Sequence, residues 1–322
     1  YSSSKIARLS VKNQAAWGTA DVTSMIDLEC EVPSFDFPTE LLEIDSIRSG
    51  FFSPPPIAGA RSGGTLTFKM RMHGWSTAGD GISTTPTEHA DSLMLKYALG
   101  ANLSDNYAGG FGRAGSSTTV IKIADLEGDN LSAGCGLVVE STTAGTYKLG
   151  VVKSKSEDGG DPDNVNLAYP LSDAPTGVSS YSIFGTNTVY LSTGLTPLTF
   201  LWTGQNEGEY YTLSDCVVES ASITCSPAGH LEVDYSVKVG NWSQTPAGAA
   251  TTSYTVSDPY LPVAVGRSGG SLATTTGSVN TELPVGDMTI TITNTLIEAR
   301  QFAASEGIAQ YILSDRVVAL SM

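Results

Sequence analysis

The sequence contains no long apolar run and few charged residues. No stretch reaches the roughly 18 to 20 consecutive apolar residues that a membrane-spanning helix requires, and residues 1–10 lack the apolar core of a secretion signal. We therefore expect a soluble protein made in the cytoplasm, with no membrane partner, provided that no leader has been removed. Charged residues make up 16% of the 322 residues against 40% hydrophobic residues, which argues against disorder and predicts a folded core.

Basic residues are scarce as well. The 17 Lys and Arg residues stand against 33 Asp and Glu residues, which gives a net charge of −16 at pH 7. A protein that binds along a nucleic acid neutralises the phosphates with basic side chains. The charge thus argues against unaided DNA binding, while it is compatible with DNA as a neighbour that must not adhere.

Residues for metal, redox or nucleotide chemistry are few. The four cysteines form no Cys-x-x-Cys pair, so we expect free and mostly buried thiols rather than a zinc site or a disulfide framework. The histidines are too scattered for a ligand set or a triad, and no GxxxxGK[S/T] loop is present. The four cysteines are Cys30, Cys135, Cys216 and Cys225, and the three histidines are His73, His89 and His230.

One acidic stretch is a candidate calcium-binding loop. Residues 158–164 carry Asp158, Asp161 and Asp163 but lack the ligand spacing, central glycine and distal glutamate of an EF-hand loop. We expect a solvated loop over residues 154–166, and another loop over residues 52–64, which contains three consecutive prolines. The sequence predicts no catalytic residue, no cofactor and no metal site.

Alternation of apolar and polar residues is the main structural signal that the sequence does contain. Residues 65–72, 231–239 and 288–293 alternate with a period of two, which is typical of strands with one buried face. The run 216–224 and the strand from Leu231 are separated by a Ser-Pro-Ala-Gly turn and predict a long antiparallel hairpin. Shorter strands are expected at residues 7–11, 119–123, 147–152, 188–191, 198–202 and 311–318.

A single helix is predicted over residues 86–99. Thr85 and Glu88 form a capping box, Pro86 occupies the first turn, and Gly100 ends the helix. Its apolar positions follow the spacing i, i+3, i+4 and i+7 and form one stripe that docks on a sheet: Ala90, Leu93, Met94 and Tyr97. The predicted fold class is all-β, an antiparallel β-sandwich or barrel with one flanking α-helix.

The order of several features resembles the tail tube proteins of long-tailed, non-contractile bacteriophages. The matching features, in chain order, are a strand at residues 6–11, the turn Trp17-Gly18-Thr19, the strand Gly63–Met70, the helix ending at Gly100, the segment Thr199–Gly204 and the hairpin over residues 213–240. The resemblance covers about the first 110 residues and the chain from about Leu195 onward. We therefore expect one tail-tube-like β domain over residues 1–322, with an elaboration or outer subdomain at about 116–193.

The resemblance implies a structural protein rather than an enzyme. Members of this family assemble as stacked hexameric rings whose inner strands join into one barrel around a channel, and viral DNA passes through it during ejection without specific binding. The implied partners are further copies of the chain and other tail proteins, namely the tape measure, terminator and distal tail proteins. The implied location is the virion tail, with assembly in the cytoplasm of the bacterial host.

Acidic side chains on the long hairpin are candidates for the channel wall. Glu219, Glu232 and Asp234 lie on the predicted hairpin, and carboxylates that face the bore would repel DNA phosphates. The alternative for each of them is an ordinary solvated face.

Two other functions fit an all-β chain rich in Ser, Thr and Gly. One is a binding module, such as a capsid decoration protein or an adhesin, which would present its surface to a shell or a glycan. The other is a glycan hydrolase, in which a carboxylate pair meets in space and tryptophans form a sugar platform. A tube subunit differs from both because it polymerises.

Overall fold

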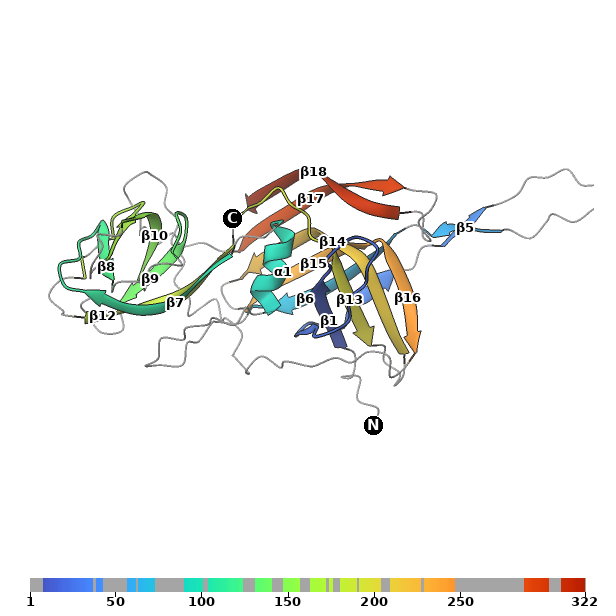
Figure 1. Ribbon diagram of the computed structural model, residues 1–322, viewed down its shortest axis with the longest axis horizontal. Helices are drawn as coiled ribbons and strands as arrows, with labels where there is room; N and C mark the ends of the chain where they lie inside the picture. Colours follow the sequence, from blue (N-terminus) through green and yellow to red (C-terminus); the bar gives the residue numbers. More distant parts are fainter. Residues whose placement is uncertain are drawn as a thin grey trace, which may run out of the picture.

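The computed structural model describes most of the chain in sixteen stretches. The described residues are 8–36, 39–42, 57–61, 63–72, 90–100, 104–123, 131–140, 147–156, 163–171, 174–175, 180–189, 191–203, 209–226, 229–246, 287–300 and 308–321. They form strands and one helix, so the predicted all-β class with antiparallel pairing and a flanking helix is confirmed. Figure 1 shows a large sheet assembly with α1 against it and a small barrel to one side.

Ten strands form one large antiparallel sheet that divides into two halves. The half that we call sheet I contains β2 (Ile26–Leu28), β1 (Arg8–Asn13), β13 (Leu198–Thr203), the first part of β14 (Glu209–Cys225) and β16 (Asn241–Pro246). The half that we call sheet II contains β3 (Ser34–Asp36), β6 (Gly64–Arg71), β15 (Leu231–Val239), the second part of β14, β17 (Met288–Arg300) and β18 (Ile308–Ser321).

Strand β14 belongs to both halves. Its residues 209–216 pair with β13 and β16, and its residues 217–225 pair with β15 and β17. The change of partners falls beside Asp215, which has a positive φ of 54° and is buried. A positive φ is uncommon for a non-glycine residue and turns the chain locally. One continuous strand therefore carries the chain from sheet I into sheet II.

One apolar core fills the space between the two halves and the helix. Alternate side chains of both sheets point into it, as expected from the period of two. The helix α1 (Ala90–Ala98) adds its stripe, with Leu93, Met94 and Tyr97 all buried. Representative core residues from the sheets are Leu9, Val11, Leu66, Phe68, Met70, Phe200, Leu213, Val218, Val233, Tyr235, Val237 and Ile292.

The predicted elements of this core agree with the structure. The alternating runs lie in β6, β15 and β17, and the long hairpin is β14–β15, in which Cys225 pairs with Leu231. The helix is confirmed for residues 90–98, and Gly100 follows it with a φ of +84°, the left-handed conformation of a helix-ending glycine. The first predicted turn, residues 86–89, lies outside the described residues.

A closed barrel of six strands is formed by the centre of the chain. Its strands are β7 (Ser104–Arg113), β8 (Val120–Ile123), β9 (Gly136–Glu140), β10 (Tyr147–Ser156), β11 (Asp163–Leu167) and β12 (Ser180–Val189), joined in the order β10-β11-β8-β7-β12-β9. The barrel has an apolar core separate from the main one, which includes Ile121, Ile123, Leu137, Val165 and Ile183. Its strands span residues 104–189, which overlap the segment at about 116–193 where an elaboration or outer subdomain is expected.

Both predicted loops contain strands, so these two predictions were wrong in part. β10 continues to Ser156 and β11 begins at Asp163, whose side chain is 1% exposed rather than solvated. β5 (Ile57–Arg61) pairs with β4 (Thr39–Leu42), and β6 begins at Gly64. Glycine, proline and aspartate dominated the sequence signal in these stretches, whereas pairing with a distant strand decided the structure. Asp158 and Asp161 lie outside the described residues.

The helix stripe predicts a difference between two neighbouring substitutions. Leu93→Ala removes a buried side chain from the main core and should lower the free energy of unfolding by about 2 to 5 kcal/mol. Lys96→Ala changes a half-buried position off the stripe and should cost less than about 1 kcal/mol. Denaturant unfolding of both variants measures this, and equal losses would show that the stripe is placed wrongly.

The four cysteines are free in the structure. Cys135 and Cys216 are buried, and Cys30 and Cys225 are half-buried. Cys216 and Cys225 lie nine residues apart in one extended strand, which separates their Cα atoms by about 30 Å, far beyond the roughly 7 Å that a disulfide spans. Mass spectrometry without reductant should therefore find four thiols, and a bridge between Cys216 and Cys225 would contradict the fold of β14.

Candidate functional site

The outward face of sheet II is a continuous polar surface. Side chains directly opposite one another on antiparallel strands lie on the same side of a sheet, so the register identifies the residues of each row. Three rows cross the sheet from β3 or β6 to β18: Ser34-Thr67-Ser236-Ser220-Thr293-Val317, Lys69-Asp234-Ser222-Thr291-Ala319 and Arg71-Glu232-Thr224-Thr289-Ser321. We call this surface the polar face.

Serine and threonine occupy the middle of the polar face. The outward positions of β14 and β17 alternate with core residues such as Ala221 and Ile292, so the period of two in each strand creates the surface. Threonine suits this position because its branched side chain favours a strand and its hydroxyl remains in water. The six hydroxyl residues in the middle are Ser220, Ser222, Thr224, Thr289, Thr291 and Thr293.

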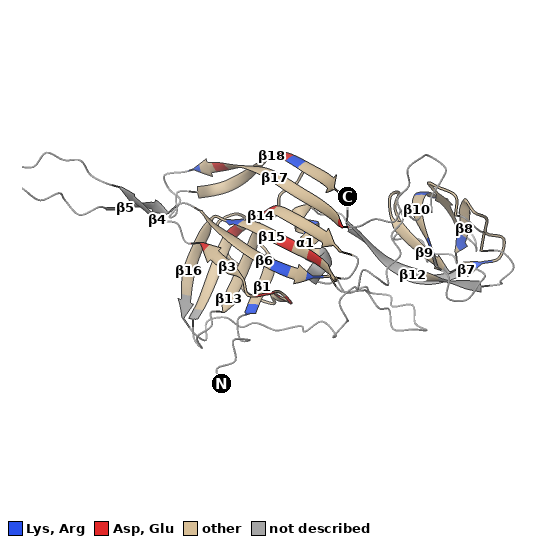
Figure 2. Ribbon diagram, turned by 180° about the vertical axis from the view of Figure 1, so that it is seen from behind, with Lys and Arg blue, Asp and Glu red and all other residues tan. Residues whose placement is uncertain are grey.

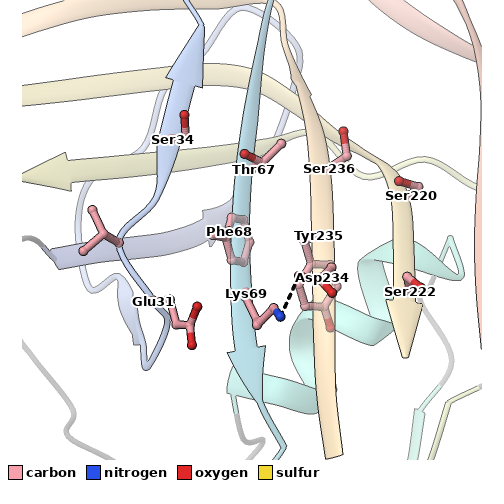
Figure 3. A pocket seen from close by; sticks show the side chains of 11 residues that line it. Glu31, Ser34, Thr67, Phe68, Lys69, Ser220, Ser222, Asp234, Tyr235 and Ser236 are labelled. Carbon is pink, nitrogen blue, oxygen red and sulfur yellow. Dashed lines mark ion pairs between the residues drawn. The ribbon is translucent and has the colours of Figure 1, made fainter. Parts of the chain in front are cut away.

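Ion pairs between β6 and β15 occupy one side of the polar face. The Lys69 ammonium lies 3.3 Å from a Glu232 oxygen and 3.6 Å from an Asp234 oxygen, and Arg71 lies 3.7 Å from Glu232. Asp234, and then Glu232, raises the pKa of Lys69 above its ordinary value because both carboxylates favour the charged ammonium. Figure 2 shows the blue and red segments on these strands, and Figure 3 shows Lys69 directed at Asp234.

A second set of contacts surrounds Glu219. Its carboxylate lies 3.4 Å from the Lys238 ammonium and accepts a hydrogen bond of 3.1 Å from the Ser236 hydroxyl. Glu219 sits at a bulge of β14, where the pairing with β15 shifts between Val218 and Ser220. The bulge turns this side chain toward the same face as Lys238.

The structure thus brings together the three acids that the sequence singled out and adds cations beside each of them. Glu31 also joins the cluster, 3.7 Å from Arg71. Four carboxylates accompany three cations here, so the cluster has a formal charge near −1, although the whole chain carries −16. Sequence reasoning missed the cations because Lys69 and Glu232 are 163 residues apart, and only the register of β6 on β15 pairs them.

A shallow groove runs over the polar face. It has a volume of about 410 Å³ and is lined by hydroxyl residues, by Glu31 and by the pair Lys69 and Asp234. Figure 3 shows Ser34, Thr67 and Ser236 around it. The lining contains neither histidine nor cysteine, and its ammonium is already paired.

Strand β18 forms one edge of sheet II and carries exposed apolar side chains. Within the described part of the chain, it pairs with β17 alone. Five large apolar side chains of this hairpin are about half exposed: Ile297, Ile312, Val317, Val318 and Leu320. A long unpaired edge with exposed apolar residues is a typical site of strand pairing with another chain.

The opposite edge of sheet II is the segment Cys30–Asp36. Ser34–Asp36 pair with β6 as β3, and the Glu31 amide donates a hydrogen bond of 2.9 Å to the Lys69 carbonyl. Between these contacts, Val32 is 60% exposed, the second most exposed of the large apolar side chains described. Both edges of the same sheet therefore present apolar groups to solvent.

The Trp17-Gly18-Thr19 turn is fixed to the point where β14 changes partners. The Gly18 amide, at a φ of +78°, donates a hydrogen bond of 2.6 Å to the Asp215 carboxylate, and the Asp215 amide donates one of 3.2 Å to the Gln14 side chain. Trp17 packs on Tyr311, with ring centroids 6.3 Å apart. Burial raises the pKa of Asp215. The turn joins the first strand to both sheets.

The remaining candidate residues do not converge on a site. His230 is exposed at the start of β15, while His73, His89 and Trp75 lie outside the described residues. Trp202 and Trp242 pack on the main core and Trp17 on a separate cluster, so these three form no common sugar platform. No group of three His, Cys, Asp or Glu side chains suited to a metal occurs among the described residues. The described helix is too short and polar to cross a membrane.

Comparison with known proteins agrees with the resemblance noted in the sequence. No curated protein matches the chain. A family model described as phage tail tube protein matches residues 4–321, which is nearly the whole chain and includes the central barrel. The match also covers the polar face and both edges of sheet II. The chain therefore belongs to the phage tail tube protein family, and it is a structural subunit of a bacteriophage tail.

Proposed function

We propose that the chain forms hexameric rings by joining sheet II of one copy to sheet II of the next, and that these rings stack into the tail tube through which DNA leaves during ejection. The observation that carries the proposal is the pair of apolar edges, β18 and the segment Cys30–Asp36, on opposite sides of one sheet. The number six comes from the resemblance to the family.

Strand direction favours this joint. The six strands of sheet II run in the order β3-β6-β15-β14-β17-β18, and every neighbouring pair is antiparallel. Five reversals separate β3 from β18, so these two strands run in opposite directions. When copies follow one another around a ring axis, β18 of one copy meets β3 of the next in the antiparallel sense. The joint is head-to-tail, which generates a ring where the rotation closes.

The polar face is the side of sheet II that lines the bore in this arrangement. The opposite side of the sheet packs on the main core over β6, β14, β15 and Ile292 of β17, which leaves the polar face as the side free to line a channel. A ring of sheets with its polar face inward presents to DNA hydroxyl rows and the paired charges Glu219, Glu232 and Asp234. Closing the sheet across copies also removes unpaired edges.

The barrel then forms an elaboration of a single tail-tube domain over residues 1–322. Its strands span residues 104–189, and it stands beside the main body in Figure 1. Further partners at the ends of the tube are other tail proteins, including the tape measure, terminator and distal tail proteins. Assembly takes place in the cytoplasm of the bacterial host, and the mature product is part of the virion tail.

Lysines at the β18 edge test the ring joint. Val318→Lys with Leu320→Lys places two charges on the apolar edge and should prevent assembly, because pairing would bury them without partners. The control is Ser243→Lys with Gln244→Lys on β16, the exposed edge of sheet I. Sedimentation and negative-stain microscopy should show rings or tubes for the wild type and the control, and monomers for the edge variant.

Two results would contradict the proposal in different ways. Assembly of the edge variant would show that β18 is not the joint. A wild type that remains monomeric or trimeric at high concentration, and that binds a glycan or a shell instead, would favour the decoration protein or adhesin.

Charge reversal tests the proposed bore. Glu232→Lys with Asp234→Lys removes the partners of Lys69 and Arg71 and leaves four neighbouring cations on the polar face. Phage with this variant should still build tails but should eject DNA more slowly at low salt, because the phosphates would meet unpaired cations; high salt should reduce the difference. Glu232→Gln with Asp234→Asn is the control for loss of the ion pairs. Normal ejection at low salt would show that these residues do not line the path.

A further inference from the structure

The barrel joins the main body through two chain segments that lie side by side. One is Leu99–Gly100 at the end of α1, shortly before β7, and the other is Ser192–Gly194, shortly after β12. The Ser192 amide donates a hydrogen bond of 2.9 Å to the Leu99 carbonyl. We call these two segments the neck, because the chain enters and leaves the barrel through them.

A single side chain from β18 contacts both segments of the neck. The Arg316 guanidinium donates through Nη1 to the Leu99 carbonyl at 2.7 Å and to the Ser192 carbonyl, and through Nη2 to the Gly194 carbonyl at 3.4 Å. Arginine suits this role because its planar group holds several donors in a fixed geometry. Leu99 also belongs to the open end of α1, where carbonyls lack partners within the helix.

Asn294 holds the guanidinium in place. Its side chain is buried, and its amide nitrogen donates to the Ala98 carbonyl at 3.0 Å and to the Val218 carbonyl at 2.7 Å. These two bonds fix the direction of the amide, so that its oxygen accepts the Arg316 Nε hydrogen at 2.5 Å. Asn294 and Arg316 are direct partners in the β17–β18 register. The contact thus connects the helix end, β14, β17 and β18.

The packing at the neck leaves no room for a side chain at Gly100. A Cβ there would meet the Arg316 guanidinium and would lie 2.5 Å from the Gly194 carbonyl oxygen. Gly100 therefore serves two purposes, since it adopts a φ of +84° and allows Arg316 to reach the carbonyls. Desolvation lowers the pKa of Arg316, and the carbonyl contacts offset the cost of withdrawing this charge from water.

We propose that Arg316 is a latch that fixes the direction of the barrel relative to sheet II. The guanidinium connects both segments of the neck to β18, so its loss frees the neck while both apolar cores remain intact. One consequence rests on the proposed function: β18 is also the strand offered to the next copy. Pairing at that edge and the direction of the barrel are then set by the same strand.

Hydrogen exchange of the full chain tests the latch. In Arg316→Ala, peptides that cover residues 99–104 and 189–195 should exchange roughly tenfold faster, the effect expected for losing hydrogen bonds to a charged donor. Peptides from β8, β11 and β14 should keep the wild-type rates. Arg316→Lys should fall between the two, because an ammonium retains the charge without the fixed geometry. The control is Arg300→Ala, an exposed arginine of the same hairpin that pairs with Glu298.

Three outcomes decide the proposal, and none depends on tube formation. Faster exchange confined to the neck supports the latch. Equal hydrogen-exchange rates of the neck peptides in Arg316→Ala and Arg300→Ala overturn it. A uniform increase of the exchange rates across the barrel and both sheets also overturns it, because it shows that Arg316 merely stabilises the fold. If Arg316→Ala does not fold, Arg316→Lys decides by the same criteria. Sedimentation of the same samples reports assembly separately, so failure of the ring proposal is distinguishable.

Discussion

The continuity of β14 through both halves of the large sheet is the constraint on which the rest of the structure depends. A strand of 17 residues supplies a central partner to sheet I and then to sheet II, so the two sheets cannot be placed independently. Asp215, with its positive φ, lies where the partners of β14 change, and Gly18 and Gln14 hold that residue by hydrogen bonds. Tyr311 adds a bond of 3.2 Å to the Val239 carbonyl on the same side of the core. The main core, the polar face and the edge at β18 all follow from this geometry.

Local patterns in the sequence were sufficient to predict much of this architecture. The alternation in residues 65–72 and 231–239 determines which side chains are buried, since the period of two is a property of each strand alone. Gly100 likewise marks the helix end through its own backbone. Pairing between distant strands left no such signal. The partnership of Lys69 with Glu232 and the contact of Arg316 with Leu99 each require a register or a crossing that no local pattern specifies. The closure of the central strands into a barrel escaped prediction for the same reason, because the six strands close only through their mutual pairing.

The ion pairs on the polar face change the meaning of the acidic composition. Charges interact strongly only within about 8 Å at physiological ionic strength, so DNA close to this face responds to local groups rather than to the net charge of −16. Locally, Lys69, Arg71 and Lys238 each lie near a carboxylate, and the neighbouring rows contribute hydroxyls. In the proposed tube, a phosphate could bind a cation only by displacing its carboxylate. DNA would then slide along the wall without binding, because the cations of the wall are paired with carboxylates and the neighbouring rows carry neutral hydroxyls. This mechanism requires no strong repulsion along the bore.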